Sequence, residues 1–410
     1  MGWCIRLFFL FWEQGLAGFW YIYVFLWSAN CSPFLRTYNF AFQLSLGPLI
    51  GAICAGCTAV LKPSESAPSA ATVIEKVIAE ALDPSAFAVV QGAVPETTAL
   101  LNEKWDKIFY TGGTAVAKII SKKAAETLTP VTLELGGKNP AIVTKNADVR
   151  LAARRLLWGK SVNAGQVCVS QNYTLIDESV LPAFLQELEK AFTDFYPAGL
   201  KASPDYGRIA TRRAFDNLQK MLSDSHGKVL LGGDEAPDAE SLFFPLTVVQ
   251  VSSPSDSLIA EESFGPLIPL LPVPDLDTAI RIANEVSATP LGLYPFGTKA
   301  ETDRIMQELR SGGVTVNDAF FHASLPTLQF GGVGESGQGS YRGRASFDCF
   351  THRRSVVTTP SWMEGLLAVR YPPFAGTGKL ERFRGMSDLK VTFDREGRST
   401  GWFGRWLGGW

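Results

Sequence analysis

Apolar strands and amphipathic helices alternate along most of this 410-residue chain, and that alternation constrains its fold more than any other feature. Short apolar runs predict strands at residues 58–61, 87–91, 107–110 and 131–135. Helical spacing predicts the elements between them, at residues 66–81, 95–101 and 115–127. Strands joined by crossover helices imply a parallel sheet, and open α/β folds bind ligands at the carboxyl edge of such a sheet.

The helix predicted over residues 66–81 carries clear local signals. Ser66 is a candidate N-cap, and Pro68 stands in the first turn, where its missing N–H costs nothing. The expected buried face of this helix consists of Val73, Ile74, Val77, Ile78 and Ala81.

A second α/β unit is predicted from residue 148 onward. Helical periodicity covers residues 148–163 and 180–195, and strand-like runs cover residues 173–176, 243–251, 267–273 and 313–316. A chain of 410 residues also suggests two or three domains, because single hydrophobic cores stop growing beyond about 250–300 residues.

The first 36 residues differ in character from the rest of the chain. No charged residue occurs from Gln14 to Leu35, and residues 16–27 are an unbroken apolar and aromatic run. A membrane-spanning helix needs about 20 apolar residues, and residues 7–29 reach that length only by including Glu13 and Gln14. A buried strand, or sequence outside the mature fold, is the alternative, and a signal peptide fits poorly.

The composition excludes several classes of protein. Lys plus Arg number 38 against 40 Asp plus Glu, so no basic field exists to hold nucleic acid. Six scattered cysteines do not make a disulfide framework, which indicates a reducing compartment. Three histidines without a paired metal-binding pattern lead us to expect no metal.

Cys168 and Glu134 are the strongest candidates for chemistry. Cys168 follows a segment of small residues, where a thiol can face a cleft, although a lone cysteine is more often a small buried hydrophobe. Glu134 ends a predicted strand, where most glutamates are simply solvated. Together they suit thioester chemistry, because a carboxylate close to a cysteine can activate the water that hydrolyses a thioester.

Three further positions suit binding, each with an ordinary structural alternative. Asn39 is an amide among aromatic residues and could hold an oxyanion. Lys62 follows a strand directly, and with Glu65 it could contact ribose hydroxyls, but Lys-Pro after a strand is also a common turn. The segment 112–114 (GGT) opens a helix after a strand, which favours phosphate but is also a plain capping turn.

These residues occur in motifs whose order resembles that of the aldehyde dehydrogenase family. The segments that carry the resemblance are residues 39–44 (NFAFQL), 61–65 (LKPSE), 109–114 (FYTGGT), 133–138 (LELGGK), 163–168 (NAGQVC), 262–266 (ESFGP) and 330–337 (FGGVGESG). Residues 371–374 (YPPF) resemble the ending of the fatty-aldehyde, class 3-like branch. Seven ordered motifs are far more specific than a single pattern.

The resemblance implies NAD(P)-dependent oxidation of a medium- or long-chain aldehyde to a carboxylic acid. Cys168 would attack the aldehyde, and the Asn39 amide would hold the oxyanion together with the backbone N–H of Cys168. Glu134 would then activate the water that releases the acid.

The resemblance also implies the cofactor contacts. Lys62 and Glu65 would hold the adenosine ribose, Gly113 and Thr114 the pyrophosphate, and Glu262 with Phe264 the nicotinamide end. Ser64, Gly112, Leu135 and Gly136 complete the expected set. NAD is expected over NADP, because the Glu65 carboxylate would repel a 2′-phosphate, although NADP remains an alternative.

The chain departs from the family pattern near its start. It has Tyr38-Asn39-Phe40-Ala41 where the family has Trp-Asn-Tyr-Pro, and Ala117 where the family has glycine. Residues 1–36 resemble nothing in the longer region that precedes this Asn in the family. We therefore expect the first strands of the cofactor domain to be missing, with sheet edge exposed unless the aromatic segment substitutes for them.

The expected fold is therefore α/β, with a parallel-sheet cofactor domain and an α/β catalytic domain. The expected divisions are an N-terminal segment (1–36), the NAD(P)-binding domain (37–137), the catalytic domain (138–340) and a closing segment (341–410). A non-catalytic or truncated relative, tethered to a membrane, is the alternative function. A cytoplasmic or membrane-associated location follows from either, with an aldehyde as substrate and a homodimer left open.

Overall fold

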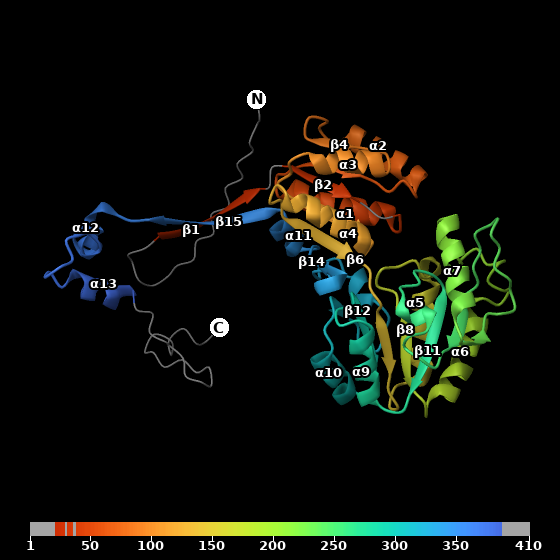
Figure 1. Cartoon of the computed structure of the whole chain (residues 1–410). Helices are drawn as coiled ribbons and strands as arrows, with labels where there is room; N and C mark the ends of the chain where they lie inside the picture. Colours follow the sequence, from red (N-terminus) through yellow and green to blue (C-terminus); the bar gives the residue numbers. More distant parts are fainter. Residues whose placement is uncertain (1–20, 29–30, 36–37, 388–410) are drawn as a thin grey trace. The chain divides into compact units, whose positions relative to one another are not determined.

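Strands and helices alternate along the larger of two compact units, which includes residues 38–352 (Figure 1). The computed structural model describes residues 21–28, 31–35 and 38–387. Within this unit the described strands form a six-stranded and a seven-stranded sheet. The second unit includes residues 353–387.

The six-stranded sheet has the doubly wound order of nucleotide-binding folds. Successive strands run outward from β2 to β3 and β4, and the chain then returns to place β5 and β6 on the other side of β2. All pairs are parallel except the short edge strand β14. In spatial order the strands are β14 (Gly337–Gln338), β6 (Val131–Leu135), β5 (Ile108–Gly112), β2 (Cys31–Leu35), β3 (Thr58–Lys62) and β4 (Phe87–Val89).

Strand β2 occupies the centre of this sheet although it contains a proline. Pro33 lies opposite Val60 of β3, and pairing with β5 begins only at Phe34, so the missing N–H falls where the β5 ladder has not yet begun. Residues 1–36 were expected to lie apart from the cofactor domain. The finding that residues 31–35 are part of its sheet corrects that boundary, because a short Pro-containing strand gives little signal in the sequence.

Helices cover both faces of this sheet, as its alternating side chains require. Ile108 and Tyr110 of β5 pack with α4, whereas Phe109 between them joins the core on the α1 side. The helices are α1 (Ala41–Cys54), α2 (Pro68–Ala81), α3 (Val94–Asn102), α4 (Thr114–Ala125) and α11 (Arg344–Cys349).

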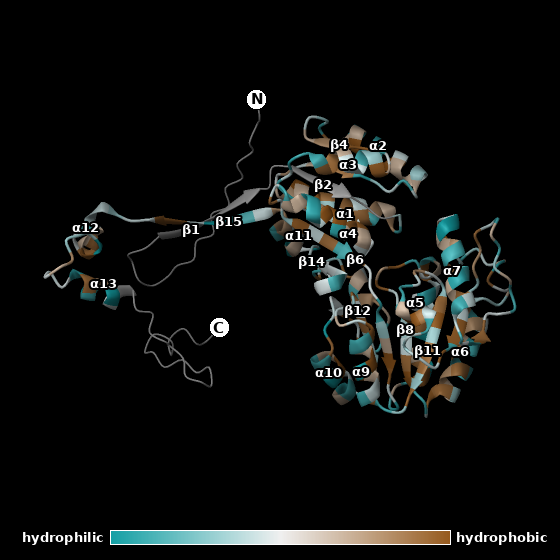
Figure 2. Cartoon of the chain, in the orientation of Figure 1, coloured by the Kyte–Doolittle hydropathy of each residue, from teal (hydrophilic) through white to brown (hydrophobic). Residues whose placement is uncertain are grey.

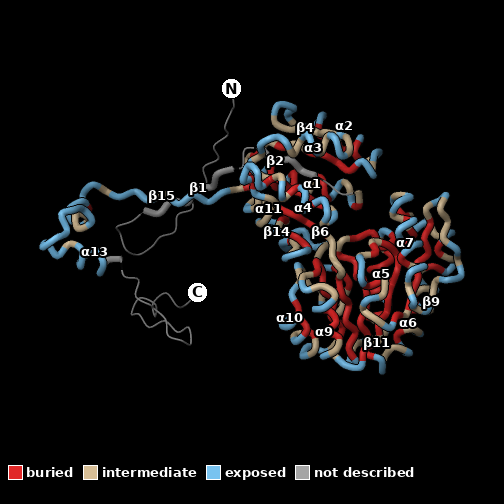
Figure 3. Tube along the Cα trace, viewed as in Figure 1, coloured by how far each residue is buried: buried red, intermediate tan, exposed pale blue. Residues whose placement is uncertain are grey.

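The seven-stranded sheet forms the other half of the unit, and its central strands are buried on both faces (Figure 3). These strands are rich in aliphatic side chains (Figure 2). Only the edge strand β9 is antiparallel to its neighbour. In spatial order the strands are β13 (Gly313–Val314), β12 (Gly292–Phe296), β7 (Pro140–Val143), β8 (Tyr173–Asp177), β11 (Leu267–Val273), β10 (Thr247–Gln250) and β9 (Lys228–Leu231).

Several of the helices around this sheet begin at side-chain caps. Asp148, Thr211 and Asp275 each accept a hydrogen bond from a backbone N–H in the first turn of α5, α7 and α9, respectively. The helices are α5 (Val149–Ser161), α6 (Leu181–Phe195), α7 (Arg212–Asp224), α8 (Ser257–Ala260), α9 (Leu276–Val286) and α10 (Lys299–Glu308).

A separate two-stranded sheet pairs β1 (Tyr21–Ser28) with β15 (Thr351–Thr358). The second unit continues after β15 with two short helices, α12 (Glu364–Leu367) and α13 (Lys379–Ser387). Residues 21–28 are extended, so that part of the N-terminal apolar run is not helical, while residues 7–20 lie outside the described residues.

Several sequence predictions need correction at the level of single elements. Helix α2 begins after Ala67, not after Ser66, and Val73 and Val77 are each 46% exposed where burial was expected. The buried stripe is narrower, formed by Ala71, Ile74 and Ile78. The sequence also gave no signal for β7, β9 or β12, and β10 covers only Thr247–Gln250 of the predicted 243–251.

Helix α1 follows the segment around Asn39 and packs against α11. Substitutions at two glycines of α1 test this packing. A Cβ on Gly51 would lie 2.8 Å from Cβ of Ser346 in α11, whereas a Cβ on Gly47 would meet nothing within 4 Å. Gly47→Ala should stabilise the protein by about 0.5–1 kcal/mol through helix propensity. Gly51→Ala should instead destabilise it, since overpacking costs about 1–3 kcal/mol. Thermal melts of the two variants check this, and equal shifts would contradict the tight α1–α11 contact.

Candidate functional site

The connection between β6 and β7 joins the carboxyl edge of one sheet to the amino edge of the other. Glu134 lies in β6 and is only 3% exposed, Leu135 ends that strand, and β7 begins five residues later at Pro140. Two glycines make the passage possible: a Cβ on Gly136 would lie 2.5 Å from the Glu262 carboxylate oxygens, and one on Gly137 would lie 3.1 Å from N of Leu291. A larger residue at position 136 would displace the Glu262 carboxylate, and one at position 137 would crowd the backbone at Leu291.

Cys168 lies on a tight turn after helix α5. Three successive residues, Asn163, Ala164 and Gly165, have φ values of 52°, 51° and 73°, which is the left-handed region. The side chain of Gln166 fixes this turn, because its Nε2 donates to O of Asn163 at 3.0 Å and to O of Arg208 at 2.9 Å. The small residues seen in the sequence therefore serve a strained turn, and a β-branched residue there would be unfavourable.

Asn39 lies directly beside this turn. It is 3% exposed, immediately before α1, and its Nδ2 donates to O of Gln166 at 3.2 Å. The N–H groups of a carboxamide are among the donors that commonly stabilise an oxyanion. The structure thus brings Asn39 and Cys168 together from opposite halves of the unit.

Sequence reasoning missed the buried Asn139, which holds the carbonyl of the candidate nucleophile. Its Nδ2 donates to O of Cys168 at 2.9 Å and to O of Ser170 at 2.8 Å, and its Oδ1 accepts from N of Gly292 at 2.8 Å. Asn139 follows the Gly136–Gly137 passage, so it links the Glu134 segment to the Cys168 turn. The only available signal was a polar residue at the start of a buried strand.

The electrostatics of the site keep the thiol protonated. Burial, together with the nearby carboxylates of Glu262 and Glu134, raises the pKa of Cys168 to about 12. Burial also raises the pKa of Glu262 to about 7, against the lowering influence of the Gly137 N–H and Lys160. A carboxyl group that titrates near neutral pH beside a thiol is typical of catalytic sites.

Lys160 was not anticipated either. It is 2% exposed, its Nζ donates to O of Gln171 at 2.8 Å, and burial lowers its pKa to about 7, with Glu262 opposing the change. The Lys160 ammonium group and the Glu262 carboxyl group thus titrate in the same range of pH within one site. Both are shifted mainly because water is excluded.

The expected adenosine-ribose residues lie at the carboxyl end of β3. Lys62 is 4% exposed, and its Nζ donates to O of Pro63 at 2.9 Å and to the Glu65 carboxylate at 3.0 Å. Ser64, between them, accepts a hydrogen bond from N of Ser66 at 3.2 Å. These contacts hold a lysine and a carboxylate together at the edge where open α/β folds bind nucleotides.

The start of α4 offers a place for a pyrophosphate. Gly112 ends β5, Gly113 is the N-cap without a side-chain cap, and Thr114 begins the helix. A Cβ on Gly113 would meet nothing within 4 Å, so a ligand can approach the N–H groups of the first turn. This point lies between the carboxyl ends of β5 and β2, where the strand order reverses.

Apolar side chains lie exposed next to that helix start. Val116 and Ile119 of α4 are 44% and 62% exposed, and Val94 of the neighbouring α3 is 74% exposed. Exposed aliphatic groups on adjacent helices suit the flat face of an adenine ring. Together with the open helix start and the Lys62–Glu65 pair, they fit a dinucleotide cofactor.

The expected nicotinamide-end residues lie against the catalytic half of the site. The Glu262 carboxylate contacts the Gly136–Gly137 passage. The Phe264 ring meets Tyr38 edge to face, with 6.0 Å between ring centroids. Every predicted site residue therefore lies at the carboxyl edge of the six-stranded sheet or in a loop that faces it.

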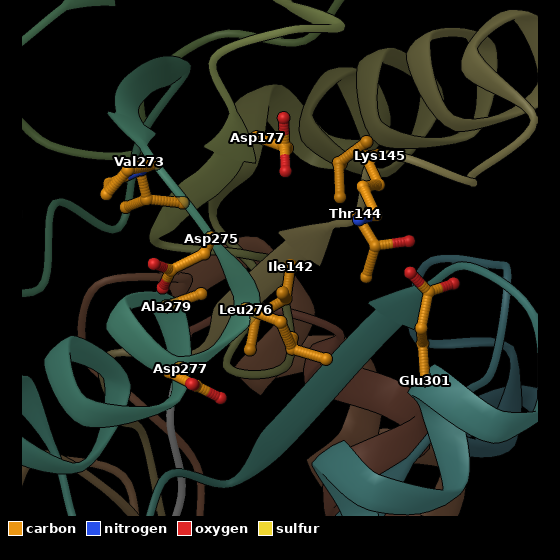
Figure 4. A pocket seen from close by; sticks show the side chains of 12 residues that line it. Ile142, Thr144, Lys145, Asp177, Val273, Asp275, Leu276, Asp277, Ala279 and Glu301 are labelled. Atoms are coloured by element: carbon orange, nitrogen blue, oxygen red, sulfur yellow. The ribbon is translucent and has the colours of Figure 1, made fainter.

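A polar cavity of about 260 Å³ lies at the opposite, carboxyl edge of the seven-stranded sheet (Figure 4). Its carboxylates already have structural partners: Asp275 accepts from N of Thr278 at 2.7 Å, and Asp277 pairs with Arg304 at 2.6 Å. Glu301 accepts from N of Thr298 at 2.9 Å. This cavity is therefore not the place where the candidate catalytic groups meet.

No group of three or more His, Cys, Asp or Glu side chains in the described ranges is placed to hold a metal ion. No described helix has both the length and the apolar character that a membrane crossing requires.

The carboxylates around Cys168 make a testable contribution to its acidity. Glu262→Gln should lower the pKa of the thiol, and Glu134→Gln should lower it by a smaller amount, because each removes a nearby negative charge. The pH dependence of alkylation by iodoacetamide, followed at the Cys168 peptide by mass spectrometry, measures this. The exposed Cys54 is an internal control. A midpoint that stays constant or rises in both variants would contradict the described electrostatics.

Comparisons with known proteins agree with this geometry. The profile of the "Aldehyde dehydrogenase family" matches residues 33–356. Beta-apo-4'-carotenal oxygenase of Neurospora crassa is 53% identical over 360 residues, which cover 88% of this chain and 67% of that protein. The "Aldehyde dehydrogenase, dimeric NADP-preferring" of Mus musculus is 43% identical over 340 residues, covering 83% of this chain and 74% of that protein.

The solved structures give the same result. The substrate-bound state of Staphylococcus aureus AldH has a TM-score of 0.86 at 36% identity and covers 92% of this chain and 81% of its own. Relatives in this group use NAD+ or NADP+. The chain belongs to the aldehyde dehydrogenase family, whose members oxidise aldehydes to carboxylic acids with NAD(P)+.

Proposed function

We propose that this protein oxidises a long, apolar aldehyde to its carboxylic acid through a covalent intermediate on Cys168. The convergence of Cys168, Asn39 and Glu134 at the junction of the two sheets carries the proposal. The Lys62–Glu65 pair, the open start of α4, and Glu262 with Phe264 together form a candidate cofactor site, and they support NAD(P)+ as the oxidant. Glu65 in this site favours NAD+ over NADP+, because its carboxylate would repel the 2′-phosphate of NADP+.

Apolar side chains near the nucleophile turn support the substrate class. Trp158, on α5, is 41% exposed and stacks on Phe320 with 5.2 Å between ring centroids. Phe321 and Leu325 nearby in the sequence are 51% and 37% exposed. Exposed aromatic and aliphatic groups of this kind suit a long hydrocarbon chain. The name of the Neurospora crassa relative denotes a carotenoid-derived aldehyde, which is a substrate of this class.

The first half of the reaction forms a bond to sulfur. The thiol proton of Cys168 passes to a neighbouring carboxylate, and the sulfur attacks the aldehyde carbonyl to give a thiohemiacetal. The Asn39 amide and the backbone N–H of Cys168 stabilise the negative oxygen. NAD(P)+, when bound, would supply the hydride acceptor at this point, and Cys168 would then carry the acyl group as a thioester.

The second half of the reaction releases the acid. Glu134 takes a proton from water, the oxygen attacks the thioester carbonyl, and the carbon–sulfur bond breaks to return the thiol of Cys168. Glu134 is buried in β6, and its carboxylate acts electrostatically on Cys168. A carboxylate close to the thioester can take a proton from the attacking water.

Turnover by the full chain tests the proposal. NAD(P)H formation with a long-chain aldehyde should disappear in Cys168→Ser. Glu134→Gln should lower steady-state turnover by about 10²–10⁴-fold, the usual contribution of a general base, while one initial burst of NAD(P)H per chain remains. Trp158→Ala should raise KM for long-chain aldehydes but not for a short one.

A soluble wild-type chain that binds no cofactor would favour the alternative function, a relative without turnover.

We also propose that the second unit contacts a membrane surface, where long-chain aldehydes concentrate. Trp362, Leu366 and Phe383 are 63%, 60% and 42% exposed, and Arg382 and Arg384 are exposed beside Phe383. Aromatic and basic side chains together suit an anionic bilayer interface. Sedimentation with phosphatidylserine vesicles should decrease in Trp362→Ser combined with Leu366→Ser. Equal sedimentation of that variant and the wild type would refute this contact.

A further inference from the structure

The side chain of Asn172 holds the backbone on both sides of Glu262. Its Nδ2 donates to O of Glu261 at 3.0 Å, and its Oδ1 accepts from N of Ser263 at 2.9 Å. One carboxamide therefore spans the residue before and the residue after Glu262. A primary amide is well suited to this task, because it presents a donor and an acceptor side by side.

Asn172 is itself firmly placed. It is 2% exposed, it immediately precedes β8, and its backbone N donates to O of Asn139 at 2.8 Å. Asn139 in turn holds the carbonyl of Cys168. The loop that carries Glu262 and the turn that carries Cys168 are therefore both held by buried asparagines that directly precede strands, Asn172 before β8 and Asn139 before β7.

The loop that Asn172 holds is not in a relaxed conformation. Phe264 has a φ of +46°, in the left-handed region that residues with a Cβ rarely adopt. Gly265 follows it because a Cβ there would lie 2.4 Å from Cδ2 of Leu218. A strained turn persists only when the surrounding structure holds it in place. The two hydrogen bonds from Asn172 do this at Glu261 and Ser263, just before Phe264.

The orientation of two side chains depends on this turn. The Glu262 carboxylate lies against Gly136, where a Cβ would come within 2.5 Å of either of its oxygens. The Phe264 ring lies edge-on to Tyr38 at 6.0 Å. If Glu261 and Ser263 lost their partner, the turn could relax toward ordinary φ values and both side chains would move.

We propose that Asn172 is a positioning residue for Glu262 and Phe264, which it orients toward the nicotinamide end of NAD(P)+. This inference rests on the proposed function. Asn172 acts on the cofactor loop, whereas Asn139 acts on Cys168, so the two asparagines divide the positioning of the site between them. Loss of Asn172 therefore affects cofactor binding far more than the reactivity of the thiol.

The test compares Asn172→Ala with a variant of a matched asparagine, Asn317, which contacts the backbone just after β12. Asn317 also clamps a backbone segment, since its Oδ1 accepts from N of Gly297 at 2.9 Å and its Nδ2 donates to O of Gly297 at 3.3 Å. Asn317→Gly removes this clamp while tolerating the local φ of +54°. Both variants of the full chain are compared with the wild type by thermal melting, by NAD+ titration of protein fluorescence, and by hydrolysis of a 4-nitrophenyl ester without cofactor.

Asn172→Ala should raise both the Kd and the KM for NAD+ by about tenfold, as expected when a pair of buried hydrogen bonds no longer supports the binding loop. Ester hydrolysis, which needs Cys168 but no cofactor, should change by less than about twofold. Asn317→Gly should alter neither quantity. A folded Asn172→Ala variant with wild-type NAD+ affinity overturns the inference, and so does one whose ester hydrolysis falls in proportion to its NAD+ binding.

A second variant decides the matter if Asn172→Ala does not fold. Asn172→Asp keeps the volume and the acceptor for N of Ser263, but the ionised side chain cannot donate to O of Glu261. It should weaken NAD+ binding relative to the wild type, with ester hydrolysis retained, and unchanged NAD+ binding would overturn the inference. A wild-type chain that neither binds NAD+ nor hydrolyses the ester would instead refute the proposed function itself.

Discussion

The Gly136–Gly137 passage is the constraint on which the rest of the site depends. It brings the carboxyl edge of a nucleotide-binding sheet to the amino edge of a second sheet, and it leaves space for the Glu262 carboxylate and the start of β12. Because the passage is so short, Glu134 of β6 and Cys168, in the turn before β8 of the other sheet, meet at one junction. The site is a product of this junction.

Exclusion of water then determines the chemistry available at the junction. Burial moves the pKa of Glu262 up and that of Lys160 down until both lie near 7, and it keeps the Cys168 thiol protonated. Removing any one of these groups therefore changes the charge seen by the others. The same low dielectric that suppresses the resting thiolate strengthens the hydrogen bonds that would stabilise an oxyanion beside Asn39.

Motifs and hydrophobic periodicity predicted the parts of the fold that local chemistry controls. The strands at residues 131–135 and 267–273 have their predicted bounds, since continuous aliphatic runs leave little ambiguity in a buried sheet. Pro-containing β2 escaped prediction because its place between β3 and β5 is decided by tertiary pairing. Asn139 and Asn172 escaped for a related reason: a buried amide is identified only by the distant backbone groups that it reaches.

The close approach of Gly165 to Gly265 has a mechanical consequence. A Cβ on Gly165 would lie 2.2 Å from O of Gly265, so the turn that carries Cys168 and the loop that carries Glu262 and Phe264 are in direct backbone contact. A side chain at position 165 would push these two segments apart. It would thereby change the distance between the sulfur and a cofactor held by this loop.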